Sequence, residues 1–390
     1  MSTQQPVYMG IGQHTYSETE HSRFDLIFPT VYNFLGMDLV IPSGSRDRAL
    51  HVPQQPRIFS ASAAEIELRI EIHQSSFDFE SASIIYQKHT SCRMTDVLIT
   101  ESQFQLPDGL QVYRKTWAPT TPPVAKLIHF HGFSDHMNNT YDLFPSLARR
   151  GIFCTGIDQR GWGRSAQNKG DRGNTGPTAA ILADMAAFIE AQFEVPPDVP
   201  VFVMGHSMGG GLVATLASTP KYQELVSRLR GIMLEAPFIG LDPTQKPSII
   251  TVFLGRLAGM LLPRFQLVQP MKVETIVRDP VVQKALKDDP LNHTTGTLEM
   301  FAAMLDRAAD LTSGKLVLND GIKSVYVAHG TADQVTSYDA SKHWFDTQTG
   351  KVADREFKSY EGWSHLLHAD LPENRQVFAD DIAEWILARV

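Results

Sequence analysis

Six short apolar runs alternate with helix-length segments over roughly the last three quarters of the chain. Each run has the length of a buried strand, and the stretches between most runs are long enough to hold a helix. Strands that alternate with helices form a mostly parallel sheet with helices packed on both faces. The sequence therefore predicts an α/β fold. The runs are AKLIHFHG, GIFCTGIDQRG, PVFVMGHSMGGG, RGIMLEAP, KSVYVAHG and REFKSYEG.

The pattern of residue types along the sequence changes at Met94. From there to Pro119 the chain reads as two antiparallel strands joined by the turn PDG. Residues 1–93 contain a Pro-rich stretch, PSGSRDRALHVPQQP, and show no alternation of predicted strands with predicted helices. We therefore predict an α/β domain over 94–390 and an N-terminal extension over 1–93. The extension is either a loosely ordered appendage or a stretch upstream of a true start at Met94.

One gap between the apolar runs is too long for a single helix. About eighty residues separate RGIMLEAP from KSVYVAHG, with helical patterns, Pro breaks and no clear strand. We interpret residues 238–320, approximately, as an inserted helical cap. Because ligands of such sheets bind beyond the carboxyl ends of the strands, we expect the cap to cover that edge.

Charge and cysteine content narrow the classes of function. The net charge is -8, and no Lys/Arg cluster is interleaved with aromatic residues, so we expect no nucleic-acid partner. Cys92 and Cys154 cannot build a disulfide framework, and their spacing fits no metal site. We expect a reducing, cytoplasmic compartment. No secretory signal is predicted, and no run reaches the roughly 20 apolar residues that span a bilayer.

One serine, Ser207, is surrounded by glycines in the run VFVMGHSMGGG. A strand before it and a helix after it form the context of a nucleophile elbow, a strained turn that exposes the serine. Gly205 and Gly209 then avoid steric collision at this turn. We assign Gly210 and Gly211 to close packing of the helix against the sheet. The alternative is a plain strand-to-helix turn without chemistry.

A serine nucleophile needs a histidine base and an acid that orients the base. In this arrangement the three residues follow the order Ser, Asp or Glu, His along the chain. Asp333 follows the strand KSVYVAHG, and His365 follows the strand REFKSYEG. Both therefore fall at the same edge of the sheet as Ser207. We predict Ser207 as nucleophile, His365 as base and Asp333 as the orienting acid.

Other titratable residues near these positions have simpler interpretations. His368 remains an alternative base because it could share a helical face with His365. His206 is expected to point away from the site and to pack, and His329 to be a satisfied core or turn histidine. Asp339 and Asp346 are expected on the solvated side of the helix after KSVYVAHG.

The tetrahedral intermediate of acyl transfer also needs two N–H donors for its oxyanion. Met208 offers a backbone N–H directly after the serine. The segment HGFSDH ends an earlier strand and offers the backbone N–H of Phe133. The alternative is that His131 and Gly132 only turn the chain.

Within the cap, the segment from Ile249 to Leu262 has apolar residues at helical spacing. Ser248 is a plausible N-cap and Pro263 a stop, which predicts an amphipathic helix of about fifteen residues. Its apolar face lines an acyl tunnel, contacts a membrane or lipid-droplet surface, or packs on the domain core. Gly255 and Gly259 weaken such a helix, which suggests the hypothesis of a lid.

From Met94 onward the sequence resembles a monoacylglycerol lipase of the α/β-hydrolase superfamily. The resemblance rests on HGFSDH, DQRGWGRS, GHSMGGG, DPL at 289–291, HGTADQV and GWSHLLHADLPE, in the order of that family. It implies Ser207, Asp333 and His365 as the catalytic triad, with Phe133 and Met208 as oxyanion donors. It also implies hydrolysis of a single acyl ester of glycerol without metal or cofactor.

Two other functions stay open on the same residues. A lysophospholipase, a thioesterase or another small-ester hydrolase would use the same triad with a different pocket beneath the cap. A catalytically silent lipid-binding protein would keep the fold, although it would be expected to lack a triad residue.

Overall fold

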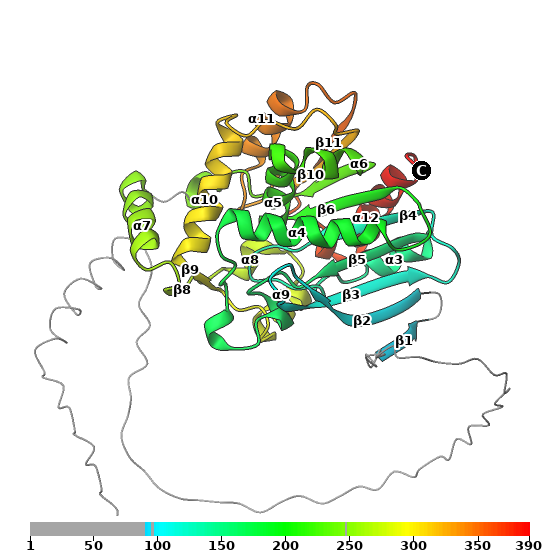
Figure 1. The fold of residues 1–390 in the computed structure, drawn as a ribbon, viewed down its shortest axis with the longest axis horizontal. Coiled ribbons are helices and arrows are strands. Elements are labelled where there is room, and N and C mark those ends of the chain that lie inside the picture. The colour runs from blue at the N-terminus through cyan, green and yellow to red at the C-terminus, as the bar shows by residue number, and fades with distance from the viewer. Residues whose placement is uncertain (1–89, 95–96, 246–247) are drawn as a thin grey trace, which may run out of the picture. The chain divides into compact units, whose positions relative to one another are not determined.

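The computed structural model of this protein describes residues 90–94, 97–245 and 248–390. They build a nine-stranded sheet in the order β1-β2-β3-β5-β4-β6-β7-β10-β11 (Figure 1). The strands are β1 (Thr90–Met94), β2 (Val97–Gln105), β3 (Gln111–Pro119), β4 (Ala125–Phe130), β5 (Ile152–Ile157), β6 (Val201–His206), β7 (Gly231–Glu235), β10 (Ser324–Gly330) and β11 (Asp354–Tyr360).

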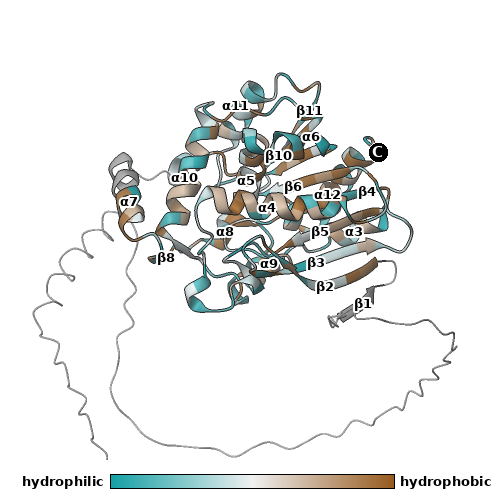
Figure 2. Cartoon of the chain, viewed as in Figure 1, coloured by the Kyte–Doolittle hydropathy of each residue, from teal (hydrophilic) through white to brown (hydrophobic). Residues whose placement is uncertain are grey.

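The pairing confirms the predicted α/β class. Strands β5, β4, β6, β7, β10 and β11 pair in parallel, and each coincides with one of the six apolar runs, β11 starting one residue before its run. Every residue of β4, β6, β7 and β10 is buried, as expected for strands covered on both faces. Figure 2 colours the strands at the centre of the sheet mostly as hydrophobic.

The predicted hairpin is also present. Strands β2 and β3 pair antiparallel from Val97–Pro119 to Gln105–Gln111. The turn between them is closed by a hydrogen bond from the Gly109 N–H to the Leu106 carbonyl (2.9 Å). The added strand β1 begins at Thr90 and pairs antiparallel with β2, so the sheet starts upstream of Met94. The rest of the predicted extension over 1–93 lies outside the described residues.

Helices cover both faces of the sheet because side chains alternate along each strand. Val201 and Val203 of β6 join one core, which the helices α4, α5, α6, α10 (Leu298–Thr312) and α11 complete. Phe202 and Met204 join a second core with α3 and α12. The bounds are α3 (Leu143–Arg149), α4 (Thr178–Phe193), α5 (Met208–Ala217), α6 (Gln223–Arg228), α11 (Tyr338–Gln348) and α12 (Pro372–Leu387).

The long gap between β7 and β10 holds mainly helices, with one short ladder that the sequence did not predict. The ladder joins β8 (Gln266–Val268) to β9 (Thr295–Thr297), antiparallel. Strands of three residues are too short for an alternating pattern to appear in sequence. The helices are α7 (Ile249–Leu261), α8 (Val273–Ile276), α9 (Pro280–Asp288) and α10 (Leu298–Thr312).

This insertion contacts loops that follow strands of the main sheet. The Gln266 side chain donates to the Arg172 carbonyl (2.8 Å) in the segment after β5, and the His293 ring bonds the Gly161 carbonyl (3.0 Å). The Leu366 N–H, after β11, donates to the Ile276 carbonyl (2.9 Å). Each contacted loop lies beyond the carboxyl end of its strand, where the predicted site residues also fall.

Candidate active site

Ser207 stands between strand β6 and helix α5 with a backbone that few residues adopt. Its φ is 53° and its ψ is -117°, and its exposed fraction is 7%. The Ser207 N–H donates to the Glu235 carbonyl (2.9 Å), and its own carbonyl accepts from the N–H groups of Gly211 (3.0 Å) and Phe238 (2.8 Å). These bonds on both sides of the residue hold the strained turn in place.

The glycines around Ser207 meet three different neighbours. A Cβ on Gly205 would overlap the Gly209 carbonyl, and a Cβ on Gly209 would overlap the Phe130 carbonyl at the end of β4. Both positions therefore require glycine for steric reasons, as expected. A Cβ on Gly211 would lie 2.6 Å from the Phe238 carbonyl, in the loop after β7. At Gly211 the close approach is thus to that loop, and not to the sheet as the sequence suggested.

Asp333 and His365 lie together at the carboxyl ends of β10 and β11. The His365 Nδ1–H donates to Asp333 Oδ2 (2.8 Å), and both side chains are almost fully buried. A histidine that donates through Nδ1 leaves Nε2 as the nitrogen that can accept a proton. The predicted base and its predicted acid therefore have the required orientation relative to each other.

Asp333 is held as a carboxylate by several donors. Its Oδ1 accepts from the N–H groups of Val335 (2.7 Å) and Thr336 (3.0 Å), and its Oδ2 accepts from the Thr336 hydroxyl (2.7 Å) and His329 Nε2 (3.0 Å). Burial alone would raise the pKa of Asp333, but the charge of His365 and these hydrogen bonds hold it well below the usual value. No motif in the sequence distinguishes Thr336 as a partner of Asp333.

The structure brings Ser207 to the same place through its neighbours. The ring of His206, the preceding residue, lies 4.9 Å from the ring of His365 between centroids. On the other side, a Cβ on Gly132 would lie 3.2 Å from the Ser207 Cβ. Ser207 therefore adjoins the loop after β4 that begins with HGF (residues 131–139, the HGF loop), and its neighbour in sequence, His206, packs beside His365.

The predicted oxyanion donors lie in these two segments. Met208 is the first residue of α5, where a helix leaves its first N–H groups without an intrahelical partner. Phe133 follows Gly132, whose backbone is adjacent to Ser207. Among the backbone–backbone hydrogen bonds of the described residues outside helices and strands, none is donated by the Phe133 N–H.

His131 fixes the peptide that carries the Phe133 N–H. The His131 Nε2 accepts from the Gln159 N–H (2.9 Å), so its Nδ1–H is free to donate to the Gly132 carbonyl (2.8 Å). The carbonyl and N–H of a trans peptide point in opposite directions. By holding the Gly132 carbonyl, His131 turns the Phe133 N–H away from its own ring. From the sequence, His131 is predicted only as a residue of the loop that carries Phe133.

Aromatic side chains tie this loop to the motif DQRGWGRS and to the insertion. The Phe133 ring lies 5.0 Å from the Trp162 ring and 5.7 Å from the Phe301 ring of α10. Trp162 in turn stacks on His293 at 4.9 Å, with the two planes 8° apart. These contacts link residues that lie far apart in sequence, so no local pattern could predict them.

Polar contacts join the same loop to the segment DPL. His136 Nε2 bonds Asp289 Oδ2 at 2.9 Å, and the Asn139 amide donates to the Asn292 side chain at 2.8 Å. The motifs HGFSDH and DPL, which stand apart in sequence, therefore form one contact between the HGF loop and the insertion.

A second histidine and carboxylate pair lies beside the first. His368 Nδ1 bonds both oxygens of Glu235 (2.8 and 3.0 Å), and its Nε2 bonds the Asn139 carbonyl (3.2 Å). Burial alone would raise the pKa of Glu235, but His368 lowers it to about 2. Glu235 in turn raises the pKa of His368 against the effect of burial. His368, the alternative base, thus has both ring nitrogens engaged as donors.

The remaining histidines and acids show one difference from expectation. His206 packs as expected, but its ring faces His365 (4.9 Å) and His368 (5.4 Å) and does not point away. Burial lowers its pKa to about 4. His329 is fully buried and bonds Asp333, so it supports the acid. Asp339 and Asp346 are exposed on α11, as expected.

Comparison with known proteins decides the family. The model of the serine aminopeptidase S33 family of hydrolases matches residues 121–372, which is more than half of the chain. The chain belongs to this family.

Relatives of this S33 chain include several lipases. A monoacylglycerol lipase of Mycolicibacterium smegmatis is 25% identical over 75% of this chain and 98% of its own length. A Schizosaccharomyces pombe protein provisionally named a monoglyceride lipase is 29% identical over 70% of this chain and 71% of its own length. A soluble variant of Saccharomyces cerevisiae monoglyceride lipase shares the fold, with a TM-score of 0.65, 21% identity, and coverage of 76% of this chain and 98% of that one. The S33 chain is therefore a monoacylglycerol lipase-like α/β-hydrolase, in the class of carboxylic ester hydrolases.

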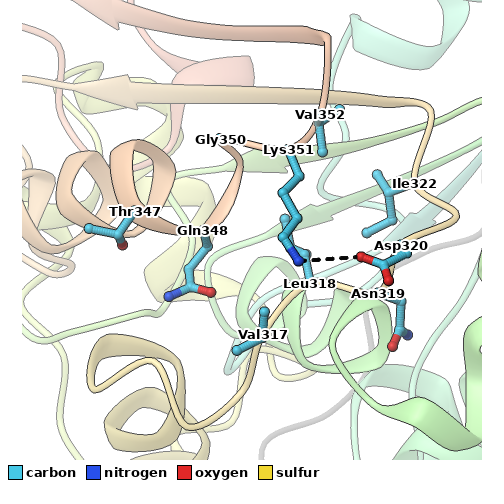
Figure 3. Close-up of a pocket in the computed structure, with 10 residues that line it drawn as sticks. All are labelled: Val317, Leu318, Asn319, Asp320, Ile322, Thr347, Gln348, Gly350, Lys351 and Val352. Atoms are coloured by element: carbon cyan, nitrogen blue, oxygen red, sulfur yellow. Dashed lines mark ion pairs between the residues drawn. The ribbon is translucent and has the colours of Figure 1, made fainter.

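One pocket of the S33 chain lies at the opposite edge of the sheet from Ser207. It has a volume of about 370 Å³ and lies between two segments that precede β10 and β11 (Figure 3). Its lining residues are Val317, Leu318, Asn319, Asp320, Ile322, Thr347, Gln348, Gly350, Lys351 and Val352. Lys351 and Asp320 form an ion pair across it at 3.6 Å. Residues at the amino ends of these strands cannot contact a substrate held at the carboxyl ends.

Two further properties concern the described part of the S33 chain alone. Within it, no group of three or more His, Cys, Asp or Glu residues is placed to hold a metal ion. None of the helices described there combines the length and the apolar content needed to cross a membrane.

Proposed function

We propose that this enzyme is a serine esterase that hydrolyses monoacylglycerol to a fatty acid and glycerol through an acyl-enzyme. The observation that carries the proposal is the 2.8 Å bond between His365 and Asp333 beside the strained turn at Ser207. The names of the lipase relatives support the substrate class. Metal and cofactor have no role in this proposal.

In the proposed reaction, Ser207 Oγ attacks the ester carbonyl and His365 Nε2 takes its proton. The bond from His365 Nδ1–H to Asp333 keeps the ring in the required tautomer and stabilises the imidazolium. The N–H groups of Phe133 and Met208 stabilise the oxyanion. His365 then gives its proton to the departing glycerol oxygen. A water molecule repeats the sequence on the acyl-enzyme and releases the fatty acid.

A panel of esters tests both the mechanism and the substrate. Monoacylglycerols, diacylglycerols, lysophospholipids, acyl thioesters and short soluble esters are compared on the wild type and on Ser207→Ala. We expect monoacylglycerol to have the highest kcat/KM and Ser207→Ala to lose all activities by about 10⁴-fold or more. Faster turnover of another ester class would contradict the substrate but not the mechanism.

A fluorophosphonate probe separates an enzyme from a silent lipid-binding protein. We expect the probe to label the wild type and not Ser207→Ala, because only an activated serine is phosphonylated. Equal labelling of the two proteins, or none in either, would overturn the assignment of Ser207 as nucleophile.

We also propose that the carboxyl-terminal end of α7 contacts a lipid surface. Met260 and Leu261 are about three quarters exposed, and Leu257 and Leu262 are exposed beside them. Apolar side chains of this size rarely gather on a surface without a partner. Arg264, also exposed, follows this patch.

The substitution Met260→Ser with Leu261→Ser tests this contact. We expect the double variant to bind phosphatidylcholine vesicles more weakly and to turn over vesicle-borne monoacylglycerol more slowly. Turnover of a short soluble ester should stay unchanged, because neither residue contacts the proposed catalytic groups. Unchanged vesicle binding would contradict the contact.

The hypothesis that α7 opens as a lid is best tested by substituting Gly255 and not Gly259. A Cβ on Gly255 would meet no atom within 4 Å, whereas one on Gly259 would lie 3.3 Å from the Leu298 carbonyl of α10. We expect Gly255→Ala to stabilise α7 by about 1 kcal/mol and to slow turnover of dispersed lipid if α7 opens. Unchanged turnover would count against a lid.

A further inference from the structure

A second pocket, separate from Ser207, lies where three helices meet. It has a volume of about 370 Å³ and opens between the start of α4, the end of α5 with the following turn, and α10. Its lining residues are Thr178, Ala179, Leu182, Thr215, Thr219, Lys221, Tyr222, Asp306, Arg307, Asp310 and Leu316. Thr215 is eight residues beyond Ser207, which is about 12 Å along the axis of α5. The pocket is therefore distinct from the proposed catalytic site.

Arg307 lines this pocket and is buried without a carboxylate partner. Its exposed fraction is 7%, and its Nη1–H donates to the Thr178 hydroxyl at 3.0 Å. Among the described residues no acid forms an ion pair with it. Burial lowers the pKa of Arg307 to about 10. A buried guanidinium normally has an anion beside it, because removing its charge from water is costly.

The acids that line the pocket are already paired with other cations. Asp306 forms an ion pair with Arg256, and Asp310 forms one with Lys315 at 2.9 Å. Lys221 adds a second positive charge at the rim, with its ammonium 5.2 Å from the Tyr222 ring. The charge of the pocket that remains available to a ligand is thus positive.

Other features of the walls define the ligand further. Helix α4 begins at Thr178 without a side-chain cap, so its first turn adds partial positive charge next to Arg307. Leu182, Leu316 and the Tyr222 ring supply apolar walls. An inorganic anion would use only the cationic end, whereas an acid with an alkyl chain would use both ends.

We propose that this pocket binds a fatty carboxylate, with its carboxylate at Arg307 and Thr178 and its alkyl chain along Leu182 and Leu316. The site goes beyond the proposed function, because it lies outside the catalytic groups. A bound acid would contact α10 of the insertion together with α4 and α5. It would therefore hold the insertion against the main domain.

Calorimetric titration with decanoate tests the site on the full chain after Ser207 has been blocked with a long-chain alkyl fluorophosphonate. The comparison ligands are decanol, which has the same chain without the charge, and inorganic phosphate, which has charge without a chain. We expect decanoate to bind about tenfold or more tightly than either one. Phosphate that binds as tightly as decanoate, or decanol that does so, would overturn the proposal.

Variants locate the binding at the pocket. Arg307→Gln should weaken decanoate binding by about tenfold or more, whereas Arg264→Gln, an exposed arginine outside the pocket, should leave it unchanged. If Arg307→Gln does not fold, Ala179→Trp serves instead. Ala179 lines the pocket and is exposed, so the protein should tolerate a larger side chain there, and the indole ring should fill the pocket. Ala179→Trp should also remove binding while leaving ester turnover intact.

Full decanoate affinity in Arg307→Gln or in Ala179→Trp would overturn the proposal. A failure of Ser207 to react with the fluorophosphonate would contradict the proposed function and leave the variant comparison valid, because every variant would be titrated with the same unblocked serine.

Discussion

Two histidines three residues apart, His365 and His368, each bond a buried carboxylate, yet their surroundings give them opposite chemistry. His365 donates through Nδ1 to Asp333, and the proposed mechanism uses its Nε2 for proton transfer. His368 bonds Glu235 through Nδ1 and the Asn139 carbonyl through Nε2. A ring with both nitrogens donating is an imidazolium, which cannot accept another proton. Because both rings bond a carboxylate through Nδ1, the partner of Nε2 is what distinguishes the proposed base, His365, from the imidazolium of His368.

The largest expected effect comes from exchanging the two rings for amides in turn. His365→Gln should lower kcat for a short soluble ester by about 10⁴-fold or more, because no other group takes the serine proton. His368→Gln should keep kcat within about tenfold. Steady-state kinetics and fluorophosphonate labelling of both variants check this. A larger loss in His368→Gln would reverse the assignment of base.

For the free energy of unfolding, the larger effect is expected from the pair of Glu235 and His368. Glu235→Gln leaves the charged His368 buried without its carboxylate, so we expect the free energy of unfolding to fall by about 3–5 kcal/mol. Urea denaturation at pH 6 measures this change. Replacing both residues, as Glu235→Leu with His368→Leu, should recover part of the loss, because no buried charge then remains. A double variant less stable than Glu235→Gln would show that the pair does more than balance charge.

The pH dependence of that loss sharpens the comparison. The folded-state pKa of Glu235 is below its usual 4.5, so its contribution is present above that value and fades as the pH falls toward about 2. The folded-state pKa of His368 is above its usual 6.5, so its contribution is full below 6.5 and fades as the pH rises through the raised value. The effect of Glu235→Gln should thus be largest between these two usual values. An effect that grows toward alkaline pH would contradict the ion pair.

The smallest effect is expected from the ring between the two pairs. Both ring nitrogens of His206 are buried without a hydrogen-bond partner among the described residues. His206→Phe replaces them with apolar atoms of similar shape, which should be neutral or stabilising by about 1 kcal/mol. We expect kcat to change by less than about threefold. A loss of hydrolysis comparable with that in His365→Gln would instead place His206 in the proton path.

Sequence patterns were sufficient for the frame of the molecule. The six apolar runs predicted the parallel strands because a strand buried on both faces leaves a continuous apolar signal. The order of Ser207, Asp333 and His365 placed each of them after a strand, and the structure brings Asp333 and His365 into contact. Their roles in catalysis stay predictions that the variants above will test.

Other parts of the site depended on contacts that no local pattern contains. Glu235 is the last residue of β7 and bonds His368, which lies 133 residues later in the sequence. The run RGIMLEAP therefore could not predict that Glu235 pairs with a histidine. His131 acts through the Gly132 carbonyl and Gln159, a relation set by the folded loop. The ladder of β8 and β9 is too short to leave a period in the sequence.

The contacts between the HGF loop and the insertion limit how this protein can be recombined with its relatives. His136 with Asp289, Asn139 with Asn292 and Phe133 with Phe301 each have one residue on either side of that boundary. A chimera that grafts a foreign segment in place of 238–320 would keep only half of each contact. Segments 131–139 and 238–320 should therefore be transplanted as a single unit when substrate preference is engineered.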